Sequence, residues 1–155
     1  MAGSKELLSN LVTVKNIVRI DEVKITFVVD DYHTIDAAVG LYSPTIIISN
    51  LPWKFCAQCT TKDAVKYLSF YVHCGNDNVG EFHCKATVEV EIVNQKDKNN
   101  HFRLYDRTFS PSILNWGWKQ FIEWSKLVDP KNGYLKGDTV TFQIKLRNLS
   151  PLIEK

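Results

Sequence analysis

The chain has 155 residues, of which 45% are hydrophobic and 23% are charged, the balance of one folded domain with a substantial core. Its formal net charge is only +2 and like charges do not form long runs, so nucleic-acid binding is not expected. No apolar run approaches the roughly 20 residues of a membrane-spanning helix, and no secretory leader pattern begins the chain, so no membrane association is expected. These features favour a cytoplasmic or nuclear protein.

The first 22 residues are predicted to form an extension ahead of the main domain. Apolar residues between Leu7 and Val12 have helical spacing, which suggests a helix over residues 5–16, whereas Leu11 to Val14 equally suits a strand. The first clear strand follows, because Ile25, Phe27 and Val29 alternate with less apolar residues.

Short strands then follow one another, separated by turn-forming clusters. Apolar alternation or β-branched and aromatic content predicts strands at residues 46–48, 53–58, 67–74, 86–92, 101–109 and 140–146. Residues 75–80 and 94–100 are rich in Gly, Asn and Asp, which favour turns. Seven or eight strands at this spacing predict an antiparallel β-sandwich.

The segment from Asn115 to Trp124 contains three of the four tryptophans of the chain. Such large aromatic side chains gather for packing or for binding. Gly117, between Trp116 and Trp118, lets the backbone pass close to a flat surface. The spacing of Trp118, Phe121 and Ile122 predicts a short helix over residues 118–126, which ends before Pro130.

The four cysteines leave a zinc site, a disulfide and buried thiols open as interpretations. Cys56 and Cys59 have the Cys-x-x-Cys spacing of zinc ligands, but Cys74 and Cys84 do not, so zinc is a minority interpretation. Buried thiols on strands are favoured, although Cys74 and Cys84 flank a turn across which they could face each other. We expect no metal and no cofactor.

A Cys–His nucleophile is the enzyme hypothesis that the sequence offers, because His73 precedes Cys74 and His83 precedes Cys84. Neighbouring residues on a strand point to opposite faces, so His73 is not placed to activate Cys74. No carboxylate that would orient either histidine is evident in the sequence. We therefore expect a domain without catalytic residues.

Four sequence blocks occur together in an order typical of one family. They are Ser43-Pro44 with Ile46–Ile48, Asn50–Lys54, Tyr67–Tyr71, and Asn115–Trp118 followed by residues 128–134. Over residues 23–149 the chain resembles the meprin and TRAF homology (MATH) family, above all the TRAF-like domains of ubiquitin-specific proteases, which leaves residues 150–155 as a C-terminal tail. The resemblance implies an all-β, eight-stranded antiparallel sandwich with one short helix after the Asn-Trp-Gly-Trp motif. It also implies a shallow groove for a short linear peptide, used to recognise partners or substrates in the ubiquitin pathway.

The resemblance places the peptide-binding residues at Gln58, Tyr71, Asn115, Trp116, Gly117 and Trp118. Alternation along residues 67–74 independently points Tyr71 away from the core. Relatives have an acidic residue at the position of Asn115 and an arginine near Gln58, and the loss of both charges suggests an altered peptide preference. The alternative is an assembly domain that binds a protein partner through another surface. Oligomers stay open, but no sustained heptads predict a coiled coil.

Overall fold

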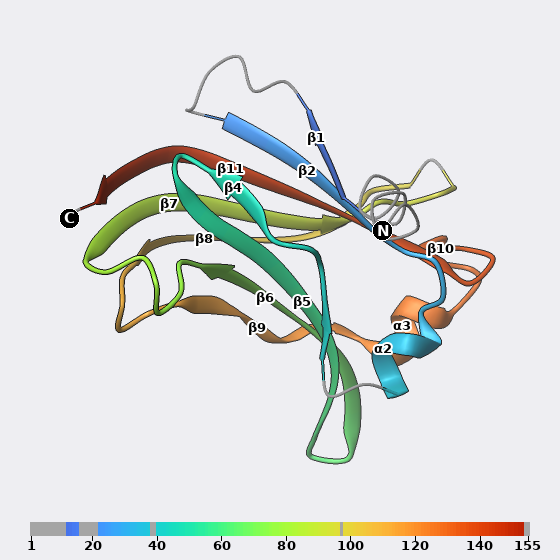
Figure 1. The fold of residues 1–155 in the computed structure, drawn as a ribbon. Coiled ribbons are helices and arrows are strands. Elements are labelled where there is room, and N and C mark those ends of the chain that lie inside the picture. The colour runs from blue at the N-terminus through green and yellow to red at the C-terminus, as the bar shows by residue number, and fades with distance from the viewer. Residues whose placement is uncertain (1–11, 16–21, 38–39, 97, 154–155) are drawn as a thin grey trace, which may run out of the picture.

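The computed structural model describes residues 12–15, 22–37, 40–96 and 98–153, which form two antiparallel sheets packed face to face (Figure 1). Sheet A has the order β1 (Val12–Lys15), β2 (Glu22–Val29), β11 (Thr139–Ile153), β7 (Phe82–Ile92) and β8 (His101–Phe109), with β10 (Leu135–Lys136) beside β11. Sheet B has the order β3 (Leu41–Tyr42), β5 (Leu51–Lys62), β6 (Val65–Cys74) and β9 (Asn115–Glu123), with β4 (Ile46–Ile48) beside β5. The expected all-β sandwich is confirmed, and the short strands β3, β4 and β10 accompany eight longer ones among the described residues.

The core lies between the sheets because β2, β7 and much of β11 alternate buried and less buried residues. Phe27 of β2 and Phe142 of β11 are paired in register and are both buried. Across the sandwich, the ring of Phe70 on β6 lies 4.8 Å from that of Phe142, between centroids. Burial of one such side chain contributes about 1.5–3 kcal/mol, so these contacts hold the two sheets together.

A two-residue turn joins β5 to β6, and the end of this hairpin projects beyond the sandwich (Figure 1). Asp63 and Ala64 both have positive φ, at 52° and 65°. Positive φ at both central residues defines the turn type whose twist matches that of the paired strands. The predicted strands at residues 53–58 and 67–74 are both present, and they pair with each other in this hairpin.

The helix predicted over residues 118–126 is wrong in its first part, because β9 continues to Glu123 and helix α3 spans only Trp124–Val128. The register between β6 and β9 shifts between Leu68 and Phe70, so three residues of β9, 119–121, stand opposite Ser69. This bulge turns Phe121 and Ile122 toward the core together, and both are buried. Adjacent buried residues within a bulge imitate helical spacing.

A second helix, α2 (His33–Ala37), is absent from the sequence-based prediction. It has five residues, too few for a periodic apolar signal, and its buried Ile35 is the residue that attaches it to the core. Asp31 accepts a hydrogen bond from the backbone N–H of His33 at 3.0 Å, which satisfies a donor at the start of the helix. Within the described part of the chain, no helix has the length and apolar character needed to cross a membrane.

Both ends of the described chain contribute strands. Val12–Lys15 forms β1, which favours the strand interpretation there, while the rest of the segment 5–16 lies outside the described residues. At the other end, β11 pairs with β7 through Ile153. The ladder therefore extends past residue 149, and the domain boundaries drawn from the sequence stay a prediction.

Candidate functional site

Sheet B ends at β9, which has β6 on one side and, among the described residues, no strand on the other. Paired residues of antiparallel strands point to the same side of a sheet. Tyr71 therefore shares a side with Gly117 on β9 and Cys56 on β5, and His73 shares it with Asn115. We call this side the outer face of sheet B, made of residues Tyr42, Lys54, Cys56, Gln58, Ser69, Tyr71, His73, Asn115 and Gly117.

The outer face gathers four of the six residues predicted to bind peptide, namely Gln58, Tyr71, Asn115 and Gly117. Trp116 and Trp118 point the other way, because they pair with the core residues Val72 and Phe70. The two tryptophans lie at the open side of the sandwich, where β9 approaches the edge strand β8 of sheet A. The predicted site is thus divided between the face of sheet B and its edge.

The tryptophans are held by side chains from β8. The indole of Trp116 is 40% exposed, and the Arg107 guanidinium carbon lies 3.6 Å from the centroid of its ring. Trp118 is half-buried, with its ring centroid 4.8 Å from that of Tyr105. Trp116 is consequently available to solvent, whereas Trp118 mainly joins the two sheets.

Gly117 is placed where a side chain would not fit. A Cβ atom at this position would lie 2.0 Å from the Phe70 carbonyl oxygen and 2.7 Å from the Tyr71 Cα. The flat surface that this glycine approaches is therefore the backbone of β6. Close approach brings β9 against the strand that carries Tyr71.

Side chains that the sequence did not assign to the peptide site complete the outer face. The Tyr42 ring lies 5.5 Å from the His73 ring between centroids, and the Lys54 ammonium lies 4.8 Å from the Tyr42 centroid. Alternation along residues 67–74 predicts His73 on the same side as Tyr71, which the register confirms, and alternation from Gln58 could also have found Lys54 and Cys56. Tyr42 gave no signal, because β3 has only two residues and meets Cys56 through long-range pairing.

The titrating groups of this face are mostly neutral. Burial, followed by the charge of Lys54, lowers the pKa of His73 below that of an ordinary histidine. Burial raises the pKa of the Tyr71 hydroxyl and that of the Cys56 thiol. The outer face as defined contains no carboxylate, so Lys54 is its charged group near neutral pH.

The bulge of β9 receives hydrogen bonds from side chains of β8 rather than from the backbone of a paired strand. Arg103 donates from Nε and Nη2 to the carbonyls of Phe121 and Gln120, at 3.2 and 3.3 Å. His101 Nε2 donates to the same Phe121 oxygen at 2.7 Å. In the first half of β9, the Tyr105 hydroxyl donates to the Trp116 carbonyl at 2.9 Å, so an added strand there would pair through the other outward-facing backbone groups of residues 115–118.

Strand geometry separates Cys74 from His73, and Cys56 from Cys59. Cys74 is fully buried while its neighbour His73 lies on the outer face, as strand alternation predicted. Its hydrogen bond with Cys84, and then burial, raise the pKa of the Cys74 thiol and keep it protonated. No disulfide links the four cysteines. Cys56 and Cys59 point to opposite faces of β5, because Cys59 pairs with the core residue Leu68.

One group of possible metal ligands in the described chain lies outside the outer face of sheet B as defined above. Ligand atoms of Asp31, His33 and Asp138 fall within 4.8 Å of one another, and all three residues are exposed. Asp31 and His33 already contact each other at 2.7 Å in the turn that precedes α2. This pairing accounts for the geometry of the turn without an ion.

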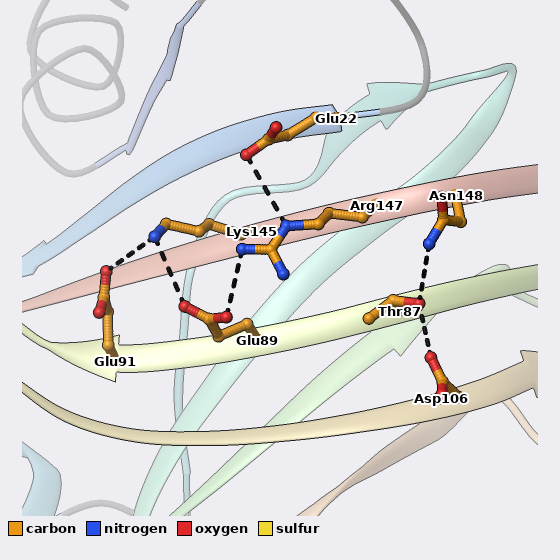
Figure 2. Close-up of polar contacts among 8 residues, drawn as sticks. All are labelled: Glu22, Thr87, Glu89, Glu91, Asp106, Lys145, Arg147 and Asn148. Atoms are coloured by element: carbon orange, nitrogen blue, oxygen red, sulfur yellow. Dashed lines mark hydrogen bonds and ion pairs between the residues drawn. The ribbon is translucent and has the colours of Figure 1, made fainter.

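The face of sheet A that is turned away from the core carries charged side chains that pair with one another (Figure 2). Lys145 lies 3.5 Å from Glu89 and 3.4 Å from Glu91, and Arg147 donates to Glu89 at 3.2 Å. Beside them on β8, Phe102 and Leu104 are 56% and 51% exposed. If the domain binds a protein partner through a surface other than sheet B, as the alternative in the sequence analysis has it, these exposed apolar side chains are the candidate contact.

Comparison with known proteins addresses the family directly. A family model described as "MATH domain" matches residues 22–146, from β2 into β11. Two curated relatives, from Caenorhabditis elegans and Caenorhabditis briggsae, are both named "Ubiquitin carboxyl-terminal hydrolase 7"; they are 22% and 21% identical over 121 and 120 residues, in each case 68% of this chain. The chain spans only about a tenth of these relatives, 11% and 10% of their lengths.

A solved structure described as "CBM4 structure and function" matches with 9% identity over 88% of this chain and 89% of that chain. Its TM-score of 0.19 is too low for an argument about fold or function. The family model, in contrast, covers most of the chain and agrees with the sandwich and with the Asn-Trp-Gly-Trp strand at its edge. The chain belongs to the MATH domain family.

Proposed function

We propose that this domain binds a short extended peptide of a partner protein along the first half of β9 and across the outer face of sheet B. The supporting observation is that an edge strand adjoins a face that carries Tyr71, Tyr42 and Asn115. Backbone groups at a strand edge provide affinity, and neighbouring aromatic side chains select the peptide. The role proposed for the domain is recognition, without catalytic residues of its own.

The biological setting is proposed from the relatives. Two of them are named as ubiquitin carboxyl-terminal hydrolases, and this chain matches about a tenth of their length. We propose that the domain recognises partners or substrates in the ubiquitin pathway, in the cytoplasm or the nucleus. One shallow groove buries little surface and must order a flexible peptide, so we expect a dissociation constant in the micromolar range.

The test begins with selection of random twelve-residue peptides on the immobilised domain, followed by calorimetry with the enriched sequences. Tyr71→Ala removes an aromatic ring from the outer face of sheet B. We expect this variant to bind the enriched peptides at least about tenfold more weakly, a loss of about 1.4 kcal/mol. Circular dichroism and thermal unfolding establish that the variant stays folded.

A second candidate function, assembly through sheet A, is favoured by the exposed Phe102 and Leu104 on β8. The double variant Phe102→Ser, Leu104→Ser is therefore the matched control for the peptide experiment. Peptide binding that survives this change and is lost in Tyr71→Ala supports the groove. Binding that is lost in the β8 variant and indifferent to Tyr71 moves the function to sheet A.

A further inference from the structure

A hollow of about 410 Å³ lies beyond the bulge of β9, at the end of the sandwich that carries helix α3 (Figure 1). It is lined, among other residues, by His101 and Arg103 of β8, by Lys126 of α3 and by Tyr134 of the segment that follows the helix. We call it the α3 pocket. None of its lining residues belongs to the outer face of sheet B as defined above, so the proposed peptide contacts on that face leave the pocket unused.

His101 and Arg103 project into the gap between the sheets. Each pairs with a buried residue of β7, so its side chain lies on the inner side of sheet A, and both donate to the Phe121 carbonyl of β9. Arg103 makes one more bond, to the Gln120 carbonyl at 3.3 Å, and no carboxylate in the described part of the chain pairs with it. A guanidinium has five N–H donors, so Arg103 retains donors for an anion.

Lys126 supplies a second cation to the α3 pocket. Its side chain is 66% exposed, and its ammonium lies 3.9 Å from Glu123, the one carboxylate among the described lining residues. Burial, and then the charges of Arg103 and Lys126, lower the pKa of His101, so both cations lie within electrostatic range of its ring. The pocket therefore combines three basic groups with one carboxylate.

The segment after α3 brings further positive charge to the same end of the molecule. Lys96 donates from Nζ to the Pro130 carbonyl at 2.6 Å. Lys98 donates to the Lys131 carbonyl at 2.9 Å. The carboxylate of this segment, Asp129, accepts a hydrogen bond from the backbone N–H of Lys131 at 3.0 Å. Since the whole chain has a formal net charge of only +2, its positive charge is concentrated here, where it attracts anions.

We propose that the α3 pocket binds an anionic side chain, a carboxylate or a phosphate monoester, of the peptide that lies along β9. The anion accepts hydrogen bonds from Arg103 and Lys126. Side chains of β8 already occupy the carbonyls of residues 120 and 121, so the peptide contributes a side chain here rather than a paired strand. This inference rests on the proposed function and deepens it.

The position of the pocket sets the position of the anion in the peptide. The residues that β9 contributes to the pocket lie four to seven positions beyond Trp116. At about 3.3 Å per residue of an extended chain, this separation is about 13–23 Å. The acidic residue is therefore expected about four to seven residues from the one that lies beside Trp116, a spacing that a twelve-residue peptide contains.

The first experiment uses the peptides enriched on the wild-type domain. Each is synthesised with glutamate, glutamine or phosphoserine at the acidic position that selection reveals, and each is titrated into wild type, Lys126→Gln and Lys131→Gln. We expect the change from glutamate to glutamine to weaken binding to wild type about tenfold, and binding to Lys126→Gln by about threefold or less. Lys131 is not among the described lining residues, so Lys131→Gln removes the same charge as a matched control and should keep the tenfold difference.

The second experiment observes the pocket directly, with inorganic phosphate as the probe and no peptide. Proton NMR follows the pH titration of each histidine ring with and without phosphate. Phosphate in the pocket offsets the charges of Arg103 and Lys126, so we expect it to raise the pKa of His101, and to do so less in Lys126→Gln. His83, exposed at the other end of β7 from the partner of His101, is the internal control and should not respond.

The two experiments together separate the possible occupants. An enriched motif without an acidic position, or a glutamate-to-glutamine loss that is equal in the three proteins, overturns this inference alone. If His101 responds to phosphate in that case, the pocket takes a free anion and the peptide does not fill it. Absence of any enriched motif overturns the proposed function as well. When the inference holds, the tighter of the glutamate and phosphoserine peptides identifies the preferred anion.

Discussion

At the scale of single residues, Gly117 decides how closely the edge strand lies against the sheet. Its missing side chain leaves room for the carbonyl of Phe70, to which a Cβ would come within 2.0 Å. That atom is backbone, so it cannot move aside as the end of a flexible side chain would. The closeness of β9 to Tyr71 is thus a property of one residue type at one position.

Gly117→Ala is predicted to separate β9 locally from β6. Overpacking against a fixed backbone costs about 1–3 kcal/mol, and we expect a loss of that size in the free energy of unfolding, measured in urea. Peptide binding should weaken as well, because Asn115 and Tyr71 would move apart. Gln120→Ala, an exposed position on the same strand, is the control and should change stability by less than about 0.5 kcal/mol. An unaffected Gly117→Ala variant would contradict the close contact.

At the scale of elements, the bulge in β9 determines which side chains face the core. The fully buried Ser69 donates its hydroxyl to the carbonyl of Lys119, and it accepts from Thr60 Oγ1 at 2.7 Å. Arg103 and His101 satisfy the next two carbonyls from the opposite sheet. Residues 119–121 of β9 have no backbone partners on β6, and these side-chain hydrogen bonds satisfy their carbonyls instead.

Ser69→Ala tests this account of the bulge. The change leaves the Lys119 carbonyl without its donor, which costs about 1–3 kcal/mol of unfolding free energy. Amide hydrogen exchange should accelerate in residues 119–122 more than in β5, because the loss is local. Thr60→Val keeps the bond from Ser69 to Lys119 and should cost clearly less. Equal losses in the two variants would show that the bulge does not depend on Ser69.

The same elements show how far the sequence could predict the structure. Alternation over residues 86–92 and 140–146 gave correct strands, because both pair regularly on each side within sheet A. Residues 118–123 were mistaken for helix because the bulge breaks their period of two. In the site, Tyr71 was oriented correctly by its own strand. Arg107 and Tyr42 were missed because their importance arises from contacts across sheets and strands, which no local pattern records.

At the scale of the whole molecule, the open side of the sandwich is closed by side chains rather than by a strand. His101, Arg103 and Tyr105 on β8 all donate to carbonyls of β9. These bonds join the edges of sheets A and B, so a peptide that binds at β9 contacts residues of both sheets. Binding and the mutual position of the sheets are therefore expected to be coupled.

The pH dependence of folding follows from two half-buried histidines, one on each sheet. Burial is the main cause that lowers the pKa of both His73 and His101 in the folded protein. Below the ordinary histidine pKa of about 6.5, the unfolded chain binds protons that the folded chain excludes, so stability falls as the pH drops from 7 to 5.

The release of one proton changes the free energy of unfolding by at most about 1.4 kcal/mol per pH unit. Each histidine contributes less than this limit, because both rings are partly in water. Asp31, whose pKa is lowered mainly by its hydrogen bond with the His33 backbone, loses its contribution only at more acidic pH, as the pH falls past about 4. Urea unfolding at several pH values between 5 and 7 measures the slope. The variant His73→Gln, His101→Gln should flatten it, because glutamine retains an amide donor but does not titrate; a slope unchanged in this variant would assign the effect to other groups.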